Sequence, residues 1–345
     1  MIRQGTMLRC ALVIAALLLA SGLGRAEPKV RLRMAAIAPD GTAWARELHA
    51  LSRDIVNETN GQVEMKWYLG AIAGDELTAL ERIKKNQLDG MAGAIFCERL
   101  APSLWVTRIA GLLRNREEAH LILNRLFPTV EKEFTANGFV ALALGNFGSE
   151  VFFSRTPIRS MADLRKGHYW TWSLDEVWLK EMPAMGIQSV ALPVEAAAQA
   201  YDEGRIDGFF GVPTAALAFQ WSSRAKYFTN LSAAILPGCI ALSQRALDSI
   251  PVELQRVVRS AAAKFSVRFE DLGHRQDQQL LGGLFEHQGL KNTPPSDAFA
   301  AEFFEAARRV REEMGAKLVP PDLLKQVDVW LDEARKVEIP AKPAH

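Results

Sequence analysis

The alternation of short apolar runs with amphipathic segments after Lys29 constrains the fold of this 345-residue chain more than any other feature. Residues 29–37 are typical of a strand that enters a core, and residues 42–61 have helical spacing that ends at an Asn-Gly pair. A second strand, a helix with acids first and lysines last, and a third strand follow, in "QVEMKWYL", "GDELTALERIKKNQ" and "LDGMAGAIF". This βαβαβ order predicts a parallel sheet with right-handed crossovers.

A second α/β unit begins near residues 140–154 and runs through "HYWTW", "IQSVALP" and "GFFGVP". Residues 225–243 are apolar and strand-like, and helical periodicity then continues for about 35 residues after Pro251. At ~1.5 Å per residue this helix is about 50 Å long, enough to span both units. We therefore predict an α/β fold of two domains with a long bridging helix. The expected boundaries are 27–150 with 214–250 for domain I, and 151–213 with 251–340 for domain II, which also carries the C-terminal helices.

The first 26 residues have the layout of a secretory signal peptide. Arg3 and Arg9 precede an apolar run from Cys10 to Ala20, and a small-x-small site ends at Ala26. The run is about half of the ~20 residues that a spanning helix needs. We predict cleavage near Ala26 and export to the periplasm, while an uncleaved anchor stays the alternative.

Charge and motif content exclude several function classes. Without the leader, 38 basic side chains face 40 acidic ones, so no basic footprint for nucleic acid is expected. The six histidines stand singly, without metal-ligand spacing, and no P-loop, dinucleotide fingerprint or Gly-x-Ser-x-Gly motif occurs. We expect no metal, no cofactor and no catalysis. Cys97 and Cys239 remain in the mature chain, and the sequence leaves open whether they pair or stay free thiols.

Four passages in the same order resemble one protein family. They are "WYLGAIAGDELTALERIKKNQLDGMAG", "TPIRSMADLRKGHYWTW", "MGIQSVALPVEAAAQAYDEGRIDGFFGVP" and "ALSQRALDSIPVELQRVV". Together they are similar to the extracytoplasmic substrate-binding proteins of TRAP transporters, the DctP type, over nearly all of residues 29–340. The resemblance implies two α/β domains that close on a small organic ligand, and a bound form that docks on TRAP membrane permease subunits.

The chain departs from this family at "KGHYWTW". The family's strand after Lys-Gly usually carries an arginine that pairs with the ligand's carboxylate, and here ungapped placement puts Thr171 at that position. Because an unpaired carboxylate is costly in a closed cleft, we expect an apolar or aromatic ligand instead. Trp170 and Trp172 share one strand face, and Tyr169 shares the other with Thr171, so we expect only one pair to face the ligand. The candidate ligand-binding residues are Trp170, Thr171, Trp172, Asp175, Phe209, Phe210, Val212, Phe96, Cys97, Arg155 and Trp221.

Other interpretations stay open. A small carboxylate could be held by Arg99, Arg155 or backbone amides. A secreted enzyme that reuses the cleft would need Cys97 beside Glu98 or a histidine as its nucleophile and base. A partner-dependent scaffold would have a filled cleft. The apolar segment "AFAAEFFEAARRV" leaves a homodimer open as well.

Overall fold

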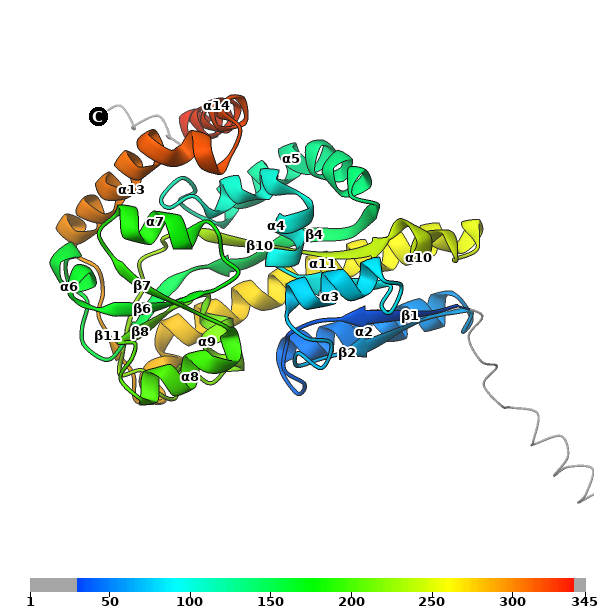
Figure 1. Cartoon of the computed structure of the whole chain (residues 1–345), viewed down its shortest axis with the longest axis horizontal. Helices are drawn as coiled ribbons and strands as arrows, with labels where there is room; N and C mark the ends of the chain where they lie inside the picture. Colours follow the sequence, from blue (N-terminus) through cyan, green and yellow to red (C-terminus); the bar gives the residue numbers. More distant parts are fainter. Residues whose placement is uncertain (1–29, 338–345) are drawn as a thin grey trace, which may run out of the picture.

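The structure is a computed structural model that describes residues 30–337. The predicted signal peptide and its cleavage site lie outside the described residues. The described chain forms two lobes, each built on one β-sheet, as Figure 1 shows. None of its helices is both long and apolar enough to cross a membrane.

The first lobe contains a five-stranded sheet in the order β2-β1-β3-β10-β4. Its first three strands come from the opening βαβαβ segment, and β1 pairs in parallel with both β2 and β3, as predicted. β10 then joins β3 and β4 in antiparallel register. The strands are β1 (Val30–Ala35), β2 (Val63–Tyr68), β3 (Gly90–Gly93), β4 (Phe139–Ser149) and β10 (Ile235–Ser243).

The second lobe contains a six-stranded sheet in the order β11-β9-β5-β8-β6-β7. β6 pairs in parallel with β7 and β8, whereas β5 is antiparallel to β8 and β9. The apolar run 225–243 is therefore two strands in different sheets, although we expected residues 214–250 to lie together in domain I. The strands are β5 (Val151–Ser154), β6 (His168–Trp172), β7 (Gln188–Leu192), β8 (Gly208–Gly211), β9 (Tyr227–Thr229) and β11 (Lys291–Asn292).

Polar side chains begin several of the helices that flank the sheets. Thr42, Asp75, Asn115, Ser160 and Ser296 each accept a backbone N–H of the first turn, which satisfies a donor that the helix itself leaves free. The helices of the first lobe are α2 (Ala43–Glu58), α3 (Glu76–Lys84), α4 (Ile95–Leu100), the 3₁₀ helix η1 (Pro102–Arg108), α5 (Arg116–Ala136) and α10 (Gln244–Asp248). Those of the second lobe are α6 (Met161–Lys166), α7 (Trp178–Ala184), α8 (Val194–Asp202), α9 (Pro213–Ala218) and α12 (Phe285–His287).

Two adjacent chain segments connect the sheets. β4 of the first sheet passes into β5 of the second through a single residue, Glu150, and residues 230–234 run back from β9 to β10. The segments pair with each other, because Glu150 N donates to Ala234 O at 2.9 Å and Ala233 N donates to Glu150 O at 3.1 Å. The β4–β5 and β9–β10 stretches therefore cross between the lobes side by side, and we call them the crossing strands. Such a pair of connections is where a hinge between two lobes is expected.

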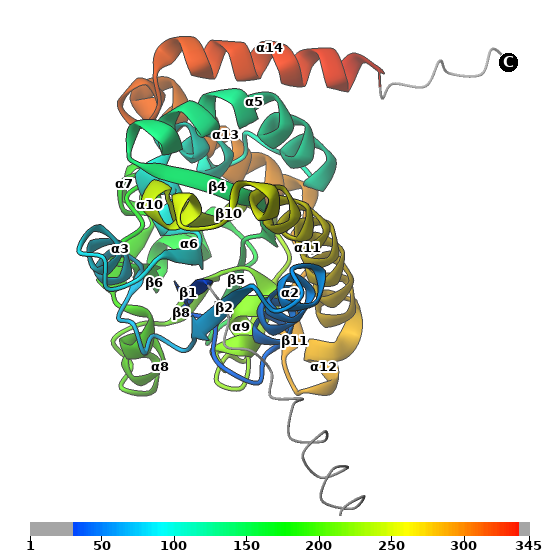
Figure 2. The ribbon, with the colours of Figure 1, turned by 90° about the vertical axis from the view of Figure 1, so that its right-hand side faces the viewer.

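The long helix α11 (Val252–Gln279) bridges the lobes, as predicted. It packs on α2 and β4 of the first lobe and on α9 of the second, and Figure 2 shows it running from α10 toward α12. Salt bridges from Lys264 to Glu58 and from Arg268 to Asp54 hold its middle against α2. The helix is interrupted beyond its end in the π-helical segment η2 (Leu280–Leu284), where Gly283 has φ 134°.

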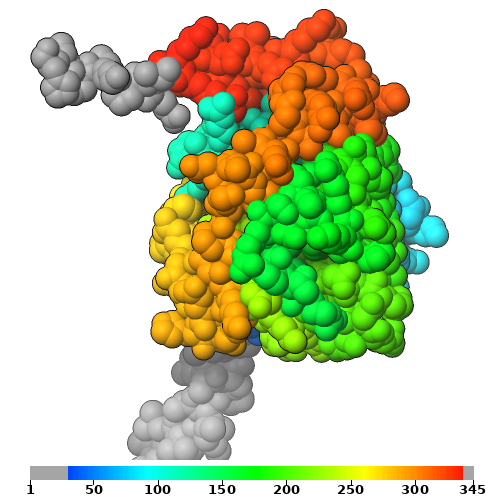
Figure 3. Space-filling model, turned by 90° about the vertical axis from the view of Figure 1, so that its left-hand side faces the viewer, coloured from blue at the N-terminus to red at the C-terminus, as the bar shows by residue number. Residues whose placement is uncertain are grey.

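The C-terminal helices make a further connection between the lobes. α13 (Asp297–Leu318) packs on α6 and α7 of the second lobe, and Figure 3 shows it in orange across the green atoms of that lobe. α14 (Pro321–Val337) lies over α5 of the first lobe (Figure 2). The lobes are therefore held together by the crossing strands, by α11 and by this helix pair.

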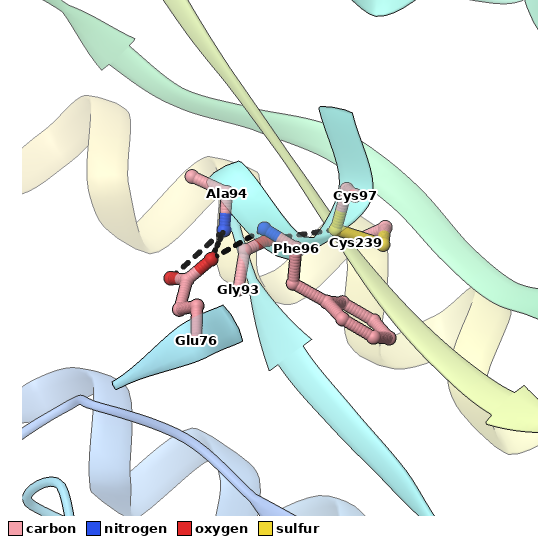
Figure 4. Close-up of a disulfide and its surroundings, with 6 residues drawn as sticks. All are labelled: Glu76, Gly93, Ala94, Phe96, Cys97 and Cys239. Atoms are coloured by element: carbon pink, nitrogen blue, oxygen red, sulfur yellow. Dashed lines mark hydrogen bonds between the residues drawn. A yellow bond between two sulfur atoms is a disulfide. The ribbon is translucent and has the colours of Figure 1, made fainter. Parts of the chain in front are cut away.

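The two cysteines of the described residues, Cys97 and Cys239, form a disulfide. It joins α4 to β10 across 142 residues of sequence, behind the loop that follows β3 (Figure 4). Both half-cystines are buried. A structural disulfide persists in an oxidising compartment, which agrees with the predicted export.

We predict that replacing both cysteines with serine lowers the free energy of unfolding by about 2–5 kcal/mol, because a crosslink over a long loop restricts the unfolded chain. Urea unfolding of the oxidised protein and the double variant measures the difference. Addition of reductant should shift the wild-type curve toward that of the variant and leave the variant unchanged. Coincident curves for all samples would contradict the role of this crosslink.

Candidate ligand-binding site

A cavity of about 140 Å³ lies between the lobes, at the carboxyl ends of the parallel strands. The first lobe contributes the loop after β1, the end of β3 and the middle of β4 and β10, and α11 adds one wall. The second lobe contributes the ends of β6 and β8 and the start of α9. This is where open α/β sheets bind ligands.

Aromatic side chains of the second lobe form one wall of the cavity. Trp221 stacks between Phe209, at 5.2 Å, and Phe219, at 5.4 Å between ring centroids, and Trp170 lies 4.7 Å from it. The indole N–H of Trp170 donates to Leu192 O at 3.0 Å, which fixes the ring with its polar atom satisfied. Trp172, Trp178 and Phe210 extend the same wall.

The polar end of the cavity is organised around Arg108, the last residue of η1. This side chain is only 1% exposed, and three carboxylates surround it. Its Nη2 donates to Asp175, which follows β6, and lies 3.4 Å from Glu150 in the crossing strand. Its Nη1 lies 3.6 Å from Glu98 of α4. The cluster therefore joins the first lobe, the hinge segment and the second lobe around one guanidinium.

Neighbouring donors order the acids of this cluster. Trp178 donates its indole N–H to Glu150 Oε2 at 2.9 Å and its backbone N–H to Asp175 Oδ1 at 3.0 Å. Glu181, buried beside them, accepts Ala110 N at 3.0 Å. These bonds place Asp175 and Glu150 before any ligand arrives, so the cluster is preorganised.

Burial has a strong effect on the acids that surround Arg108. Loss of solvation raises the pKa of Glu98 to about 8 and that of Glu150 to about 7, although the charge of Arg108 opposes both shifts. Burial also raises the pKa of Glu181 to about 8. For Arg108 itself burial acts to lower the pKa, but the negative field of Asp175, Glu150 and Glu98 is stronger and raises it, so the guanidinium stays charged.

Glu76 lies at the edge of the cavity in the first lobe. Its carboxylate accepts the backbone N–H of Ala94, at 3.1 and 3.2 Å, and that of Phe96 at 2.7 Å, as Figure 4 shows. Burial raises its pKa to about 7 despite these bonds. Gly93 is required beneath it, because a Cβ at that position would lie 2.7 Å from the carboxylate of Glu76. The hydrogen bonds to Glu76 therefore fix the backbone conformation of the loop after β3.

A second hollow, of about 520 Å³, is lined by the end of β4, the start of α5 and the second half of α11. Many of its lining residues are polar, and those from α5 and α11 include Arg116 and His274. It lies away from the carboxyl ends of β1, β3, β6 and β8. The smaller apolar cavity is therefore the better candidate for the ligand site, despite its lower volume.

Seven of the predicted site residues lie together on the cavity wall. They come from the ends of β6 and β8, from the loops that follow them and from the region beyond α9. They are Trp170, Thr171, Trp172, Asp175, Phe210, Val212 and Trp221.

The other four predicted residues lie elsewhere. Phe209 is buried between Tyr201 and Trp221, and Phe96 packs edge-on against Phe139 in the core of the first lobe. Cys97 is in the disulfide, so it offers no thiol to a ligand or to catalysis. Arg155 lies 4.1 Å above the ring of Tyr201 and donates to its backbone oxygen. None of these four side chains lines the described cavity.

The strand β6 also differs from the prediction that only one of its faces would reach the site. Trp170, Thr171 and Trp172 all border the cavity, whereas Tyr169 is buried against Phe152 in the core of the second lobe. The strand ends at Trp172, and near the end of a strand both faces are open to the adjoining cleft.

Sequence reasoning missed Arg108, Glu150 and Trp178. The sequence does carry a pattern that could have identified Arg108 and Glu150, because each is the lone charged residue of a long, mostly uncharged stretch. Arg108 is the one charge between Arg99 and Arg114, and Glu150 is the one charge between Glu133 and Arg155. Lone charges in apolar surroundings are rarely left unpaired, so such residues are candidates for a buried pair.

The raised pKa values predict that the ligand-free protein loses stability as the pH rises from about 5 to 8. The unfolded chain releases protons near pH 4.5, whereas Glu150, Glu98 and Glu181 hold theirs until pH 7–8 when folded. Each unit of difference between the two pKa values corresponds to about 1.4 kcal/mol. Urea unfolding across this pH range measures the effect.

The variant Glu98→Gln carries a permanently neutral side chain, so its stability should fall less steeply over the same range. Glu302→Gln, on the exposed side of α13, is the matched control and should follow the wild type. A wild-type stability that rises toward pH 8 would contradict the assigned protonation states.

Solved structures similar to this chain are periplasmic solute receptors. A TRAP periplasmic solute-binding protein from Haemophilus influenzae RdAW with bound L-gulonate matches with a TM-score of 0.81 and 18% identity, over 88% of this chain and 99% of that one. One from Xanthobacter autotrophicus Py2 with bound β-D-galacturonate gives 0.78 and 21%, over 87% and 98%. One from Desulfovibrio salexigens with bound orotic acid gives 0.80 and 18%, over 89% and 99%. These likenesses confirm the predicted two-domain periplasmic-binding-protein fold.

No match is found among curated protein sequences. The family model for bacterial extracellular solute-binding protein, family 7 (DctP), matches residues 34–318. The members of this family are transport proteins that bind substrates and are not enzymes, as predicted. The chain therefore belongs to the DctP family of bacterial extracellular solute-binding proteins, the receptors of TRAP transporters.

Proposed function

We propose that this protein is an exported TRAP receptor that captures a compact, largely apolar or aromatic molecule between its lobes and delivers it to a membrane permease. Family membership supports the receptor role, and TRAP receptors bind small organic ligands and work with membrane permeases. In this proposal the leader before residue 27 is removed on export, and the lobes close about the crossing strands at Glu150 and residues 230–234.

The observation that carries the ligand class is the composition of the cavity wall. Apolar and aromatic side chains from both lobes make up most of it, with small residues such as Ala38, Ala92 and Gly211 between them. Burial of apolar ligand surface contributes ~25 cal/mol per Å². Aromatic faces add stacking for a planar ligand.

The arginines near the site also favour an apolar or aromatic ligand, because each of them already contacts an acid or an aromatic ring of the protein. Arg99 pairs with Glu176 at 2.8 Å at the surface, and Arg155 is held on Tyr201. Arg108 reaches the cavity but is surrounded by Glu98, Glu150 and Asp175. A small carboxylate would therefore need a cation that the described residues do not offer freely.

The cavity size limits the ligand in this arrangement of the lobes. An apolar cavity of ~150 Å³ is large enough to bind benzene, so about 140 Å³ admits a molecule of similar bulk. The related structures from Haemophilus influenzae and Xanthobacter autotrophicus hold L-gulonate and β-D-galacturonate, which are larger and anionic. We propose that this receptor serves a different ligand class on the same fold.

We predict that compact aromatic or alicyclic compounds raise the melting temperature of the mature protein, because a ligand at 100 times its Kd adds ~2.7 kcal/mol of stability. Trp172→Ala removes part of the aromatic wall and should weaken binding roughly tenfold or more, since burial of such a side chain contributes about 1.5–3 kcal/mol. Calorimetric titration measures both affinities.

Trp330→Ala is the matched control, because Trp330 is on α14 beside Arg125 and outside the cavity wall. Its affinity should equal that of the wild type. Stabilisation by uronates but by no apolar compound would reject the proposed ligand class while leaving the receptor role intact.

A further inference from the structure

The charged groups that face the cavity are unbalanced. Among the described residues of the wall, Arg108 is the one cation, and four acids accompany it: Glu76, Glu150, Asp175 and Glu270. If Glu76 and Glu150 are both neutral, Asp175 and Glu270 still outnumber the arginine. The wall therefore carries an excess of negative charge, and an anionic ligand would increase it.

A ligand carboxylate cannot take both Nη atoms of Arg108 without displacing a partner. Nη2 donates to Asp175 and lies 3.4 Å from Glu150, whereas Nη1 lies 3.6 Å from Glu98, which is too far for a hydrogen bond. Nε is buried and has no hydrogen-bond partner among the described residues. A carboxylate that binds in the bidentate mode, through both Nη atoms, would have to displace Asp175 from Nη2 and leave that acid without its ion pair.

Acceptors, in contrast, are available to a ligand. The indole N–H of Trp178 and the guanidinium both approach Glu150 through Oε2, and among the described residues no hydrogen bond reaches Oε1. Glu270 uses Oε1 for Asn146 N at 3.2 Å, while Oε2 has only Arg116 at 3.8 Å and His120 at 3.7 Å. Neither weak contact satisfies a carboxylate oxygen, so Glu270, and Glu150 in its ionised form, can accept a hydrogen bond from a donor group.

Aromatic faces stand beside these acceptors. Trp178 donates to Glu150 and packs edge-on against Phe210, with 4.3 Å between ring centroids, so acid and rings share one corner of the cavity. Phe269 and Phe147, 5.4 Å apart, line the wall near Glu270. An ammonium group is attracted both to aromatic faces and to carboxylates, whereas a carboxylate is attracted to neither.

We propose that Asp175 acts as a built-in counter-ion of Arg108, so that the cavity excludes carboxylates and takes a compact, mostly apolar amine. The proposal rests on the proposed receptor function and names its ligand class. Asp175 is then a specificity-determining residue, because it occupies the hydrogen-bonding position on Arg108 that a ligand carboxylate would need.

A panel of matched probes tests the charge class directly. Benzyl, phenylethyl and cyclohexylmethyl compounds are each titrated calorimetrically into the mature protein as the amine, the alcohol and the carboxylate. We expect at least one amine to bind, and to bind at least about tenfold more tightly than the carboxylate with the same ring, which corresponds to about 1.4 kcal/mol. An equal or tighter carboxylate would overturn the proposal.

The remaining outcomes separate this proposal from the receptor function. Alcohols that bind as well as the amines would overturn the amine preference and leave the apolar receptor in place. Failure of the whole panel, together with stabilisation by uronates, would overturn both the amine proposal and the apolar ligand class. Failure of the panel without any stabilising ligand would also overturn both.

The variant Asp175→Asn provides a second test. It frees Nη2 of Arg108 and removes the charge that this nitrogen pairs with, so carboxylate affinity should rise by at least about tenfold. Asp202→Asn removes an exposed acid of the same lobe that pairs with Arg224, and should leave both affinities unchanged. Unchanged carboxylate affinity in a folded Asp175→Asn protein would overturn the role of Asp175. If that variant does not fold, the wild-type panel still decides the charge class.

Discussion

The guanidinium of Arg108 is the point on which the arrangement of the two lobes depends. It is buried among Glu98 of the first lobe, Glu150 of the crossing strand and Asp175 of the second lobe. Removing a partner from a buried ion cluster leaves uncompensated charge, so the geometry of the whole cluster is strongly constrained. Trp178 links the same cluster to the aromatic wall through Glu150. A change in the ion cluster around Arg108 would therefore also move Trp178 and alter the shape of the cavity wall.

This network also relates the hinge to the ligand site. Glu150 is the single residue between β4 and β5, and its backbone pairs with the adjacent crossing segment. Its side chain faces the cavity. If the lobes close about this connection, as proposed, a ligand that donates a hydrogen bond to Glu150 would act directly at the hinge. Such a ligand would then favour the closed arrangement through its contact with Glu150.

Much of the fold could be predicted from the sequence, because alternation, caps and the long helical period are local signals. The parallel opening unit and the bridging helix both follow from such patterns. The division of residues 225–243 between two sheets did not, since a crossing segment has the same apolar character as a strand. The aromatic wall was found through "HYWTW". Arg108 and Glu150 were not, because pairing between distant residues has no local pattern.

The chain shares its fold with receptors whose structures hold organic acids. The structures with galacturonate, gulonate and orotic acid are similar in backbone over almost their whole length, at 18–21% identity. The most direct test of the account is native mass spectrometry of the mature protein purified without refolding, followed by release and identification of any bound compound. The account predicts a compact, mostly apolar compound that carries an amine. A bound uronate or another small carboxylate would contradict it.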